Sequence, residues 1–162
     1  MAGINRDRNA FFDMVEGERR TSNIIMLGKV YLLDEQKARV KVKAGNLITG
    51  WLQVATLRAG EDRHFWLPEI GEQVVIASPN GDLNQGVVIG CIFSEKYPAN
   101  DNKKTHHTLS YQDNAIFRYD REHHLYQIQL PSDGKVIINV GSSSLTIDGE
   151  GISLKAKKIN LN

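Results

Sequence analysis

The sequence predicts an all-β protein in three parts: a short N-terminal helix, an OB-fold barrel and a C-terminal intertwined trimeric β-helix, or β-prism. Two observations carry this prediction. Apolar residues recur every seven positions near the C-terminus, and short alternating strands separated by turn residues fill the middle of the chain. We expect a helical segment at residues 1–20, the barrel at 21–95, a polar linker at 96–109 and the β-helix at 110–162.

The N-terminal segment has the apolar spacing of one helix face. Phe11, Phe12 and Val15 would lie on that face, and Gly17 is expected to end or weaken the helix. Two interpretations stay open: the helix packs on its own domain, or it is an adaptor that docks on a neighbouring protein.

The barrel is expected to contain five strands. Gly28 is a candidate bulge or bend in the first strand, and Pro79-Asn80-Gly81-Asp82 is the strongest hairpin-turn signal. Cys91, the only cysteine, lies in an apolar run and is expected to be buried. Five strands with mostly short turns and one long connection suit a small Greek-key barrel such as an OB-fold. The expected strands are residues 24–33, 38–43, 49–54, 73–77 and 86–93.

The stretch from Gly134 to Asn162 carries two apolar series, each stepping by seven residues. In a coiled coil the heptad splits three-plus-four, whereas here the two apolar residues of each unit lie two apart, on one face of a strand. Turn or charged residues fill the gaps, so the unit is a short strand followed by a bend. The predicted trimer core consists of Ile138, Val140, Leu145, Ile147, Ile152, Leu154, Ile159 and Leu161.

A seven-residue unit is too short to close a coil, because single-chain β-helices use about 18 residues per coil. Three intertwined chains would supply roughly 21 residues per turn and bury all the inward side chains. We therefore expect a homotrimer. The alternative is an ordinary antiparallel meander. Strand character also returns upstream, in residues 109–130, with Tyr126, Ile128 and Leu130 on one face.

Composition and charge exclude several classes of protein. The chain has 20 Lys and Arg against 19 Asp and Glu, a net charge of +1, which creates no field that favours nucleic acid or a membrane surface. The N-terminus lacks a signal-peptide pattern, and no apolar run approaches the ~20 residues that span a bilayer. We expect a protein made in the cytoplasm that does not use the general secretory route.

We expect no catalytic site, metal or cofactor. No nucleophile elbow, phosphate loop or Cys–His pairing is present, and solvation explains Asp148 and Glu150 in their bend. Adjacent histidines on a strand point to opposite faces, so neither pair chelates one metal within a chain, and we expect linker or surface positions for all five. The less favoured alternative is that copies of one histidine meet on the trimer axis. The histidines are His64, His106, His107, His123 and His124.

Several motifs, taken in order, carry a family resemblance. They are Gly28-Lys29-Val30, Ala38-Arg39-Val40-Lys41-Val42, Trp51-Leu52, Leu67-Pro68-Glu69-Ile70-Gly71-Glu72-Gln73-Val74, Asn80-Gly81-Asp82 and Gly86-Val87-Val88-Ile89-Gly90. Followed by a β-prism, they resemble the phage baseplate assembly protein V family, the central spikes of contractile-tailed phages and pyocin-like particles. The chain is more distantly similar to the spike part of type VI secretion valine-glycine repeat proteins.

The resemblance implies a homotrimeric, non-enzymatic spike and baseplate hub component, assembled in the tail of a virion or a phage-tail-like particle. OB-folds would form a collar beneath the tail tube and contact hub and tail proteins together with the N-terminal end. The β-helix would point at the target envelope and pierce the outer membrane when the sheath contracts. Nucleic acid is not an expected partner.

The chain departs from the family at its C-terminus. Long spikes of this family carry a His-x-His pair that holds an iron ion at the apex, whereas no histidine follows His124 here. The solenoid would end bluntly, and exposed apolar layers at a solenoid end need a cap. We expect a PAAR-type tip protein to contact Ile159, Asn160, Leu161 and Asn162.

The alternative function is that of an OB-fold nucleic-acid-binding protein with an oligomerising β tail. Such proteins stack bases on aromatic side chains along a basic groove. The charges near the candidate aromatics are mixed, which does not favour this alternative. The aromatics are Tyr31, Trp51, Phe65 and Trp66.

Overall fold

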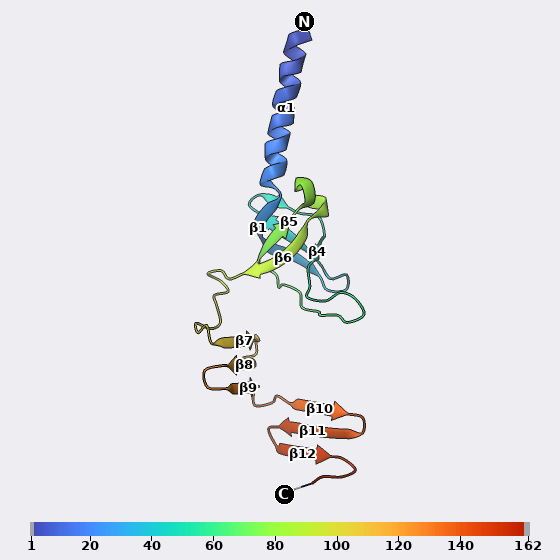
Figure 1. Ribbon diagram of the computed structural model, residues 1–162, viewed down its shortest axis with the longest axis vertical. Helices are drawn as coiled ribbons and strands as arrows, with labels where there is room; N and C mark the ends of the chain where they lie inside the picture. The colour runs from blue at the N-terminus through green and yellow to red at the C-terminus, as the bar shows by residue number, and fades with distance from the viewer. Residues whose placement is uncertain (1, 161–162) are drawn as a thin grey trace. The chain divides into compact units, whose positions relative to one another are not determined.

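The computed structural model describes residues 2–160 and divides between Pro98 and Ala99 into two compact units. The first unit holds helix α1 (Ala2–Ser22) and a six-stranded sheet, and the second holds two three-stranded sheets (Figure 1). The predicted fold class, mostly β with one short N-terminal helix, is confirmed. Among the described residues, no helix is long and apolar enough to cross a membrane.

The six-stranded sheet closes into a barrel. Its order is β1-β5-β6-β4-β2-β3, and β1 also pairs with β2, which joins the two sides of the sheet. Strands β4 and β6 are parallel, and the other pairs are antiparallel. The short β3 is an addition to the five strands predicted. The strands are β1 (Ile25–Asp34), β2 (Arg39–Ala44), β3 (Leu47–Ile48), β4 (Leu52–Val54), β5 (Gln73–Ala77) and β6 (Val87–Ile92).

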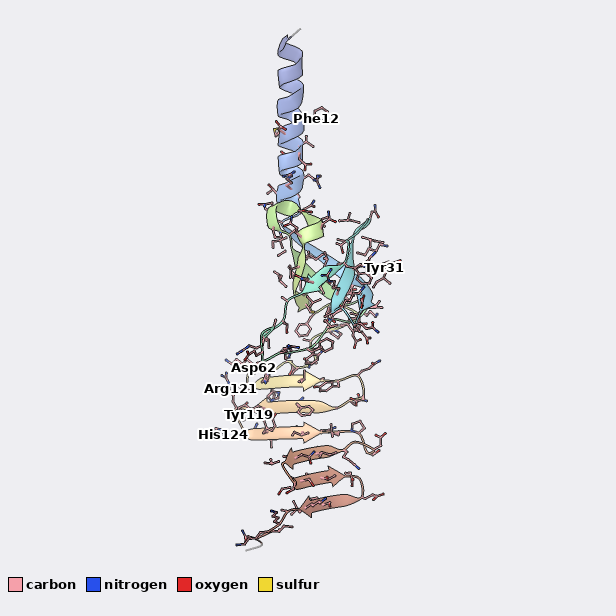
Figure 2. All side chains as sticks on the ribbon, turned by 90° about the vertical axis from the view of Figure 1, so that its right-hand side faces the viewer. Phe12, Tyr31, Asp62, Tyr119, Arg121 and His124 are labelled. Atoms are coloured by element: carbon pink, nitrogen blue, oxygen red, sulfur yellow. The ribbon has the colours of Figure 1, made fainter. Side chains whose placement is uncertain are left out.

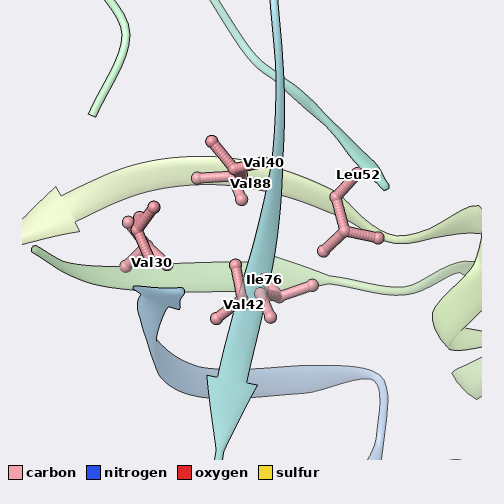
Figure 3. Close-up of a cluster of buried hydrophobic side chains, with 7 residues drawn as sticks. Val30, Val40, Val42, Leu52, Ile76 and Val88 are labelled. Atoms are coloured by element: carbon pink, nitrogen blue, oxygen red, sulfur yellow. The ribbon is translucent and has the colours of Figure 1, made fainter. Parts of the chain in front are cut away.

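Alternate residues of these strands point inward and form the barrel core (Figure 3). In β2 the alternation is complete, with Val40 and Val42 fully buried between more exposed neighbours. Fully burying a side chain of this kind stabilises a fold by roughly 1.5–3 kcal/mol. The core residues are Val30, Val40, Val42, Leu52, Val74, Ile76 and Val88.

Gly28 lies where β1 packs closely against Val42 and Lys43 of β2. A Cβ atom built there would overlap Val42 Cγ1 and stand 2.8 Å from the Lys43 carbonyl oxygen. The bulge predicted at Gly28 is instead found between Val30 and Leu32, where the register of β1 and β2 shifts. The glycine is therefore required by close packing, and the prediction of a bulge at this position was wrong.

Helix α1 continues through Gly17 and ends at Ser22, so the prediction that it ends at Gly17 was wrong. A glycine inside a helix costs only ~1 kcal/mol relative to alanine. The turn around Gly17 is supported by Glu16, whose carboxylate pairs with Arg19 at 2.7 Å and Arg20 at 2.8 Å.

The predicted hairpin turn between β5 and β6 is a pair of 3-10 turns, η1 (Pro79–Gly81) and η2 (Leu83–Gln85). Gly81 has φ of +69° and lies against the backbone of Arg20 at the end of α1, where no side chain would fit. The carboxylate of Asp82 caps η2 by accepting the Asn84 N–H at 2.9 Å. The connection is therefore the place where the barrel holds the end of α1.

Cys91 is exposed, contrary to the prediction from its apolar neighbours. Strand β6 pairs with β4 only at Val87 and Val88, so its second half has a neighbour on one side alone, β5. An apolar strand sequence does not reveal where its neighbour ends, which is why the burial of Cys91 was overestimated.

The second unit is built from two antiparallel meanders, β7-β8-β9 and β10-β11-β12. Within one chain the strands therefore pair as a meander, the arrangement that was the alternative to direct intertwining. Strand β7 begins within the predicted linker. Its polar residues did not predict a strand, but in the structure they pair with β8. The strands are β7 (His106–Ser110), β8 (Ile116–Asp120), β9 (Leu125–Gln129), β10 (Val136–Val140), β11 (Ser143–Asp148) and β12 (Gly151–Lys155).

A polar cluster ties the segment before β7 to the polar face of the first meander. Asp101 accepts hydrogen bonds from the Thr108 hydroxyl at 2.6 Å and the backbone N–H of Asn102 at 2.8 Å, and its carboxylate lies 2.9 Å from His106 Nδ1. On the other side of that ring, His106 Nε2 is 3.4 Å from Asp120 Oδ2. The prediction that His106 is a linker or surface residue was therefore wrong.

The same contacts hold the pKa values of both carboxyl groups far below their usual range. For Asp101 the main cause is the Thr108 hydroxyl, followed by His106. For Asp120 it is the hydrogen bond with His123, whose Nδ1 lies 2.6 Å away, supported by the backbone N–H of Glu122. The ionised forms of both groups are thus part of the folded structure.

We predict that Gly28→Ala lowers the free energy of unfolding of the barrel by about 1–3 kcal/mol, because the added methyl group overpacks the β1–β2 contact. The matched control is Gly90→Ala in β6, where a Cβ meets no atom within 4 Å and the change should stay within about 0.5 kcal/mol. Denaturant unfolding followed by tryptophan fluorescence measures this, since both tryptophans lie in the first unit. Equal stabilities of the two variants would contradict the assignment.

We predict that the thermal midpoint of the second unit falls as the pH drops below about 4. The folded pKa values of Asp101 and Asp120 are lower than the unfolded value of 3.8, so their stabilisation is present above that pH and is lost as the pH falls. Asp101→Asn should lower the midpoint at pH 6 and weaken its dependence on acid, whereas the exposed Asp133→Asn should do neither. Circular dichroism melts of the full chain between pH 6 and 3 provide the measurement.

Candidate trimer interface

The second meander presents one almost entirely apolar face. The register places Ile138 opposite Leu145, Leu145 opposite Leu154, and Ile147 opposite Ile152. Side chains directly opposite each other lie on the same face of a sheet. Six of the eight predicted core residues therefore share one face, which we call the β10–β12 face: Ile138, Val140, Leu145, Ile147, Ile152 and Leu154.

No segment of the same chain covers this face among the described residues. Val140 is 75% exposed, Ile152 is 71% exposed and Leu154 is 52% exposed. A sheet of three strands needs a partner for its hydrophobic face to be stable, and contiguous exposed apolar patches mark sites of association. The β10–β12 face is therefore incomplete in a single chain.

Ile159, a further predicted core residue, follows β12 in a segment without regular structure. It lines the same shallow hollow of about 300 Å³ as Ile138, Val140 and Leu154, so it extends the apolar face. Leu161 and Asn162 lie outside the described residues. The contact of Ile159–Asn162 with a tip partner stays a prediction.

The first meander has an apolar face of the same kind, which was not included in the predicted core. His107 lies opposite Tyr119, and Tyr119 lies opposite Tyr126; likewise Leu109, Phe117 and Ile128 are aligned. Tyr119 is labelled on β8 in Figure 2. The spacing of two residues between Phe117 and Tyr119, and between Tyr126 and Ile128, is the sequence pattern that could have predicted this face. We call this set the β7–β9 face: His107, Leu109, Phe117, Tyr119, Tyr126 and Ile128.

The opposite faces of both meanders are mainly polar. In the first meander that face carries the Asp101–His106–Asp120 cluster, and in the second it carries Thr146 and Ser153 as cross-strand neighbours. At its edge, Lys135 pairs with Asp148 at 3.1 Å, which lowers the pKa of that carboxyl group. Each sheet is thus amphipathic, with one side suited to solvent and the other to burial.

The histidines do not form a chelating pair. His106 and His107 are neighbours on β7, and His123 and His124 lie in the turn between β8 and β9. That turn brings ligand atoms of Asp120, Glu122 and His123 within 4.8 Å of one another, a grouping that the sequence spacing did not reveal. Since Asp120 already bonds His123 and the backbone of the turn, we assign no ion to this grouping.

Two protein families match the chain. Residues 26–93 match the type VI secretion system/phage-baseplate injector OB domain. Residues 107–162 match the Gp138 β-helical trimerization domain, which covers both meanders and supports a homotrimer.

One curated relative is the spike protein of Escherichia phage P2, which is 32% identical over 114 residues. The match covers 70% of this chain and 54% of the relative, so the chain spans about half the length of that protein. The predicted resemblance is confirmed. The chain combines an injector OB domain with a Gp138-type β-helical trimerization domain, and it is homologous to the phage P2 spike protein.

Proposed function

We propose that this chain is the structural central spike of a contractile injection machine, assembled as a homotrimer in the tail baseplate of a virion or phage-tail-like particle. The observation that carries the proposal is the pair of amphipathic sheets in the trimerization domain. Their apolar faces are exposed in one chain and share no catalytic or ligand-binding arrangement among the described residues. A sheet of this kind gains stability by association, which fits a structural role better than an enzymatic one.

In the proposed trimer the β7–β9 and β10–β12 faces of three chains turn toward a common axis. Each buried Ile, Leu or Val contributes roughly 1.5–3 kcal/mol, and every chain contributes the same set. The polar faces, including the Asp101–His106–Asp120 cluster, point away from that axis. A closed prism has no free lateral edge, so bending it requires many hydrogen bonds to break together.

Such stiffness suits the transmission of force. When a sheath contracts, a rigid prism concentrates the force on a small area of the target outer membrane. The OB domain and α1 would then hold the spike to hub and tail proteins, and α1 would act as the adaptor. Its exposed Phe12, Met14 and Val15 support this part of the proposal.

The structure offers little support for nucleic-acid binding as the alternative function. Trp51 is accompanied by one cation, Lys41 Nζ at 5.3 Å from the ring centroid. Phe65 and Trp66 lie on a different element, the long β4–β5 connection, whose charges are mixed: Arg58 and Arg63 with Glu61 and Asp62. A base-stacking groove needs aromatic and basic side chains along one path.

We predict that Ile138→Lys abolishes the trimer, because it places a charge in the buried axis of the proposed prism. The matched control is Ile137→Lys, one residue away on the opposite face, where the side chain is 54% exposed compared with 55% for Ile138. Light scattering should give about three times the chain mass of 18.2 kDa for the wild type and the control. Trimers in both variants, or in neither, would contradict the assigned orientation of the sheet.

We predict that the full chain does not bind single-stranded DNA in a salt-dependent manner. Fluorescence anisotropy at about 50 and 200 mM salt measures this, since binding through several phosphates loses orders of magnitude of affinity over that range. Strong binding that disappears with salt would favour the alternative function.

A further inference from the structure

His107 is the only basic residue of the β7–β9 and β10–β12 faces. It lies opposite Tyr119, which lies opposite Tyr126, so its imidazole points to the same side of the sheet as these two rings. Leu109, two residues further along β7, points to that side as well. Burial of this side in the proposed trimer would place a polar ring among apolar and aromatic side chains.

The His107 ring has no hydrogen bond or ion pair with any other described residue of its own chain. Its neighbour His106 differs, because it points to the polar face, where Nδ1 is 2.9 Å from Asp101 and Nε2 is 3.4 Å from Asp120. These carboxylates are on the wrong side of the sheet to pair with His107. A buried polar group costs free energy unless it is hydrogen-bonded or coordinated. In the trimer, the partner of His107 therefore comes from another copy or from a bound ion.

Three-fold symmetry brings copies of this ring together. Equivalent residues of three chains lie at the same height around the axis of a closed trimer. The three β7 strands would form one rung of the prism, with His107 and Leu109 of every chain pointing inward. Strand β7 is an edge strand that pairs with β8 alone, so this rung has the Phe117 and Tyr119 rung on one side and an open side opposite. The three imidazoles therefore converge where water can reach them.

The other four histidines do not fit this role. His64 lies in the β4–β5 connection of the first unit, and His106 is held between two carboxylates on the polar face. His123 and His124 lie in the turn between β8 and β9. The alternative that copies of one histidine meet on the trimer axis therefore applies to His107 alone.

The chemistry of this rung suits a divalent transition-metal ion. Three histidine nitrogens with a water in the fourth position form a common tetrahedral zinc site, with Zn–N distances of about 2.0–2.1 Å. Imidazole nitrogen suits zinc, nickel and copper, whereas calcium and magnesium require oxygen ligands. The β7–β9 face offers no carboxylate, so it does not favour the oxygen-binding ions.

We propose that the three His107 side chains of the trimer bind one zinc-type ion on the three-fold axis, at the β7 rung. This inference rests on the proposed trimer, because a single chain supplies one ligand of the three. The ion would link all three chains at the end of the trimerization domain where β7 lies, and it would satisfy the polar rings that the fold places on an apolar face.

Metal titration of the full chain, purified without a histidine tag and treated with EDTA, tests the proposal. After addition of Zn²⁺ and removal of the excess, native mass spectrometry should show three chains with one zinc ion. Co²⁺ as a second probe should give the strong visible absorption of a tetrahedral site and reach its plateau at one ion per three chains. Zinc should also raise the thermal midpoint of the trimer, since an ion that binds only the assembled state stabilises it.

His107→Leu keeps an apolar side chain of similar size on the face, so the variant should still form trimers, but it should lose the zinc ion and the shift in thermal midpoint. The matched control is His124→Asn, because His124 is exposed and has φ of +54°, a conformation that asparagine tolerates. This control should bind zinc as the wild type does. A second control, His123→Asn, removes a member of the Asp120–Glu122–His123 grouping and should also leave binding unchanged.

The outcomes separate the two proposals. One ion per trimer that is lost only in His107→Leu supports the axial site. A trimer that binds no zinc, or that binds one ion per chain and loses it in His123→Asn, overturns the axial site and leaves the spike proposal standing. A monomeric chain overturns both proposals, and light scattering reveals that case without any metal.

Discussion

The C-terminal unit depends on one constraint: two amphipathic sheets leave most of their apolar faces exposed within the described part of a single chain. In a globular domain a helix or a second sheet would supply that cover. Here the first meander is followed by the second, and the residues on the β10–β12 face remain exposed. Burial of these apolar faces requires other copies of the chain. The folding of this unit and its association are therefore expected to occur together.

The barrel, in contrast, buries its apolar side chains within a single chain. Its strands close on themselves through the β1–β2 pairing, and the seven core residues are shielded without a partner. Close packing at Gly28 is part of that closure, since a Cβ atom at this position would overlap Val42 of β2. The chain therefore joins a self-sufficient barrel to a unit with exposed apolar faces, a division that fits the proposed attachment and spike roles.

Much of this arrangement could be predicted from residue patterns. The seven-residue repeat correctly predicts that Ile138, Leu145 and Leu154 share one face, because the two-residue spacing within each unit fixes the side of a strand. The repeat could not show which strands are neighbours, so it did not distinguish a meander within one chain from direct intertwining. Strand pairing depends on residues that are far apart in the sequence, whereas the seven-residue repeat is a local pattern.

The failures have the same origin. His106 forms part of a strand and a buried polar cluster because of Asp101, Thr108 and Asp120, none of which alters its local pattern. Cys91 is exposed because β4 ends early. Gly28 was correctly singled out, but the positions of Val42 and of the Lys43 backbone explain it.

The C-terminal sheets are incomplete alone, so the unmodified chain is expected to exist as three copies. Native mass spectrometry over a range of protein concentrations tests this most directly. The expected result is a particle of three times 18.2 kDa that persists on dilution. A folded monomer of 18.2 kDa with the C-terminal strands intact would contradict it.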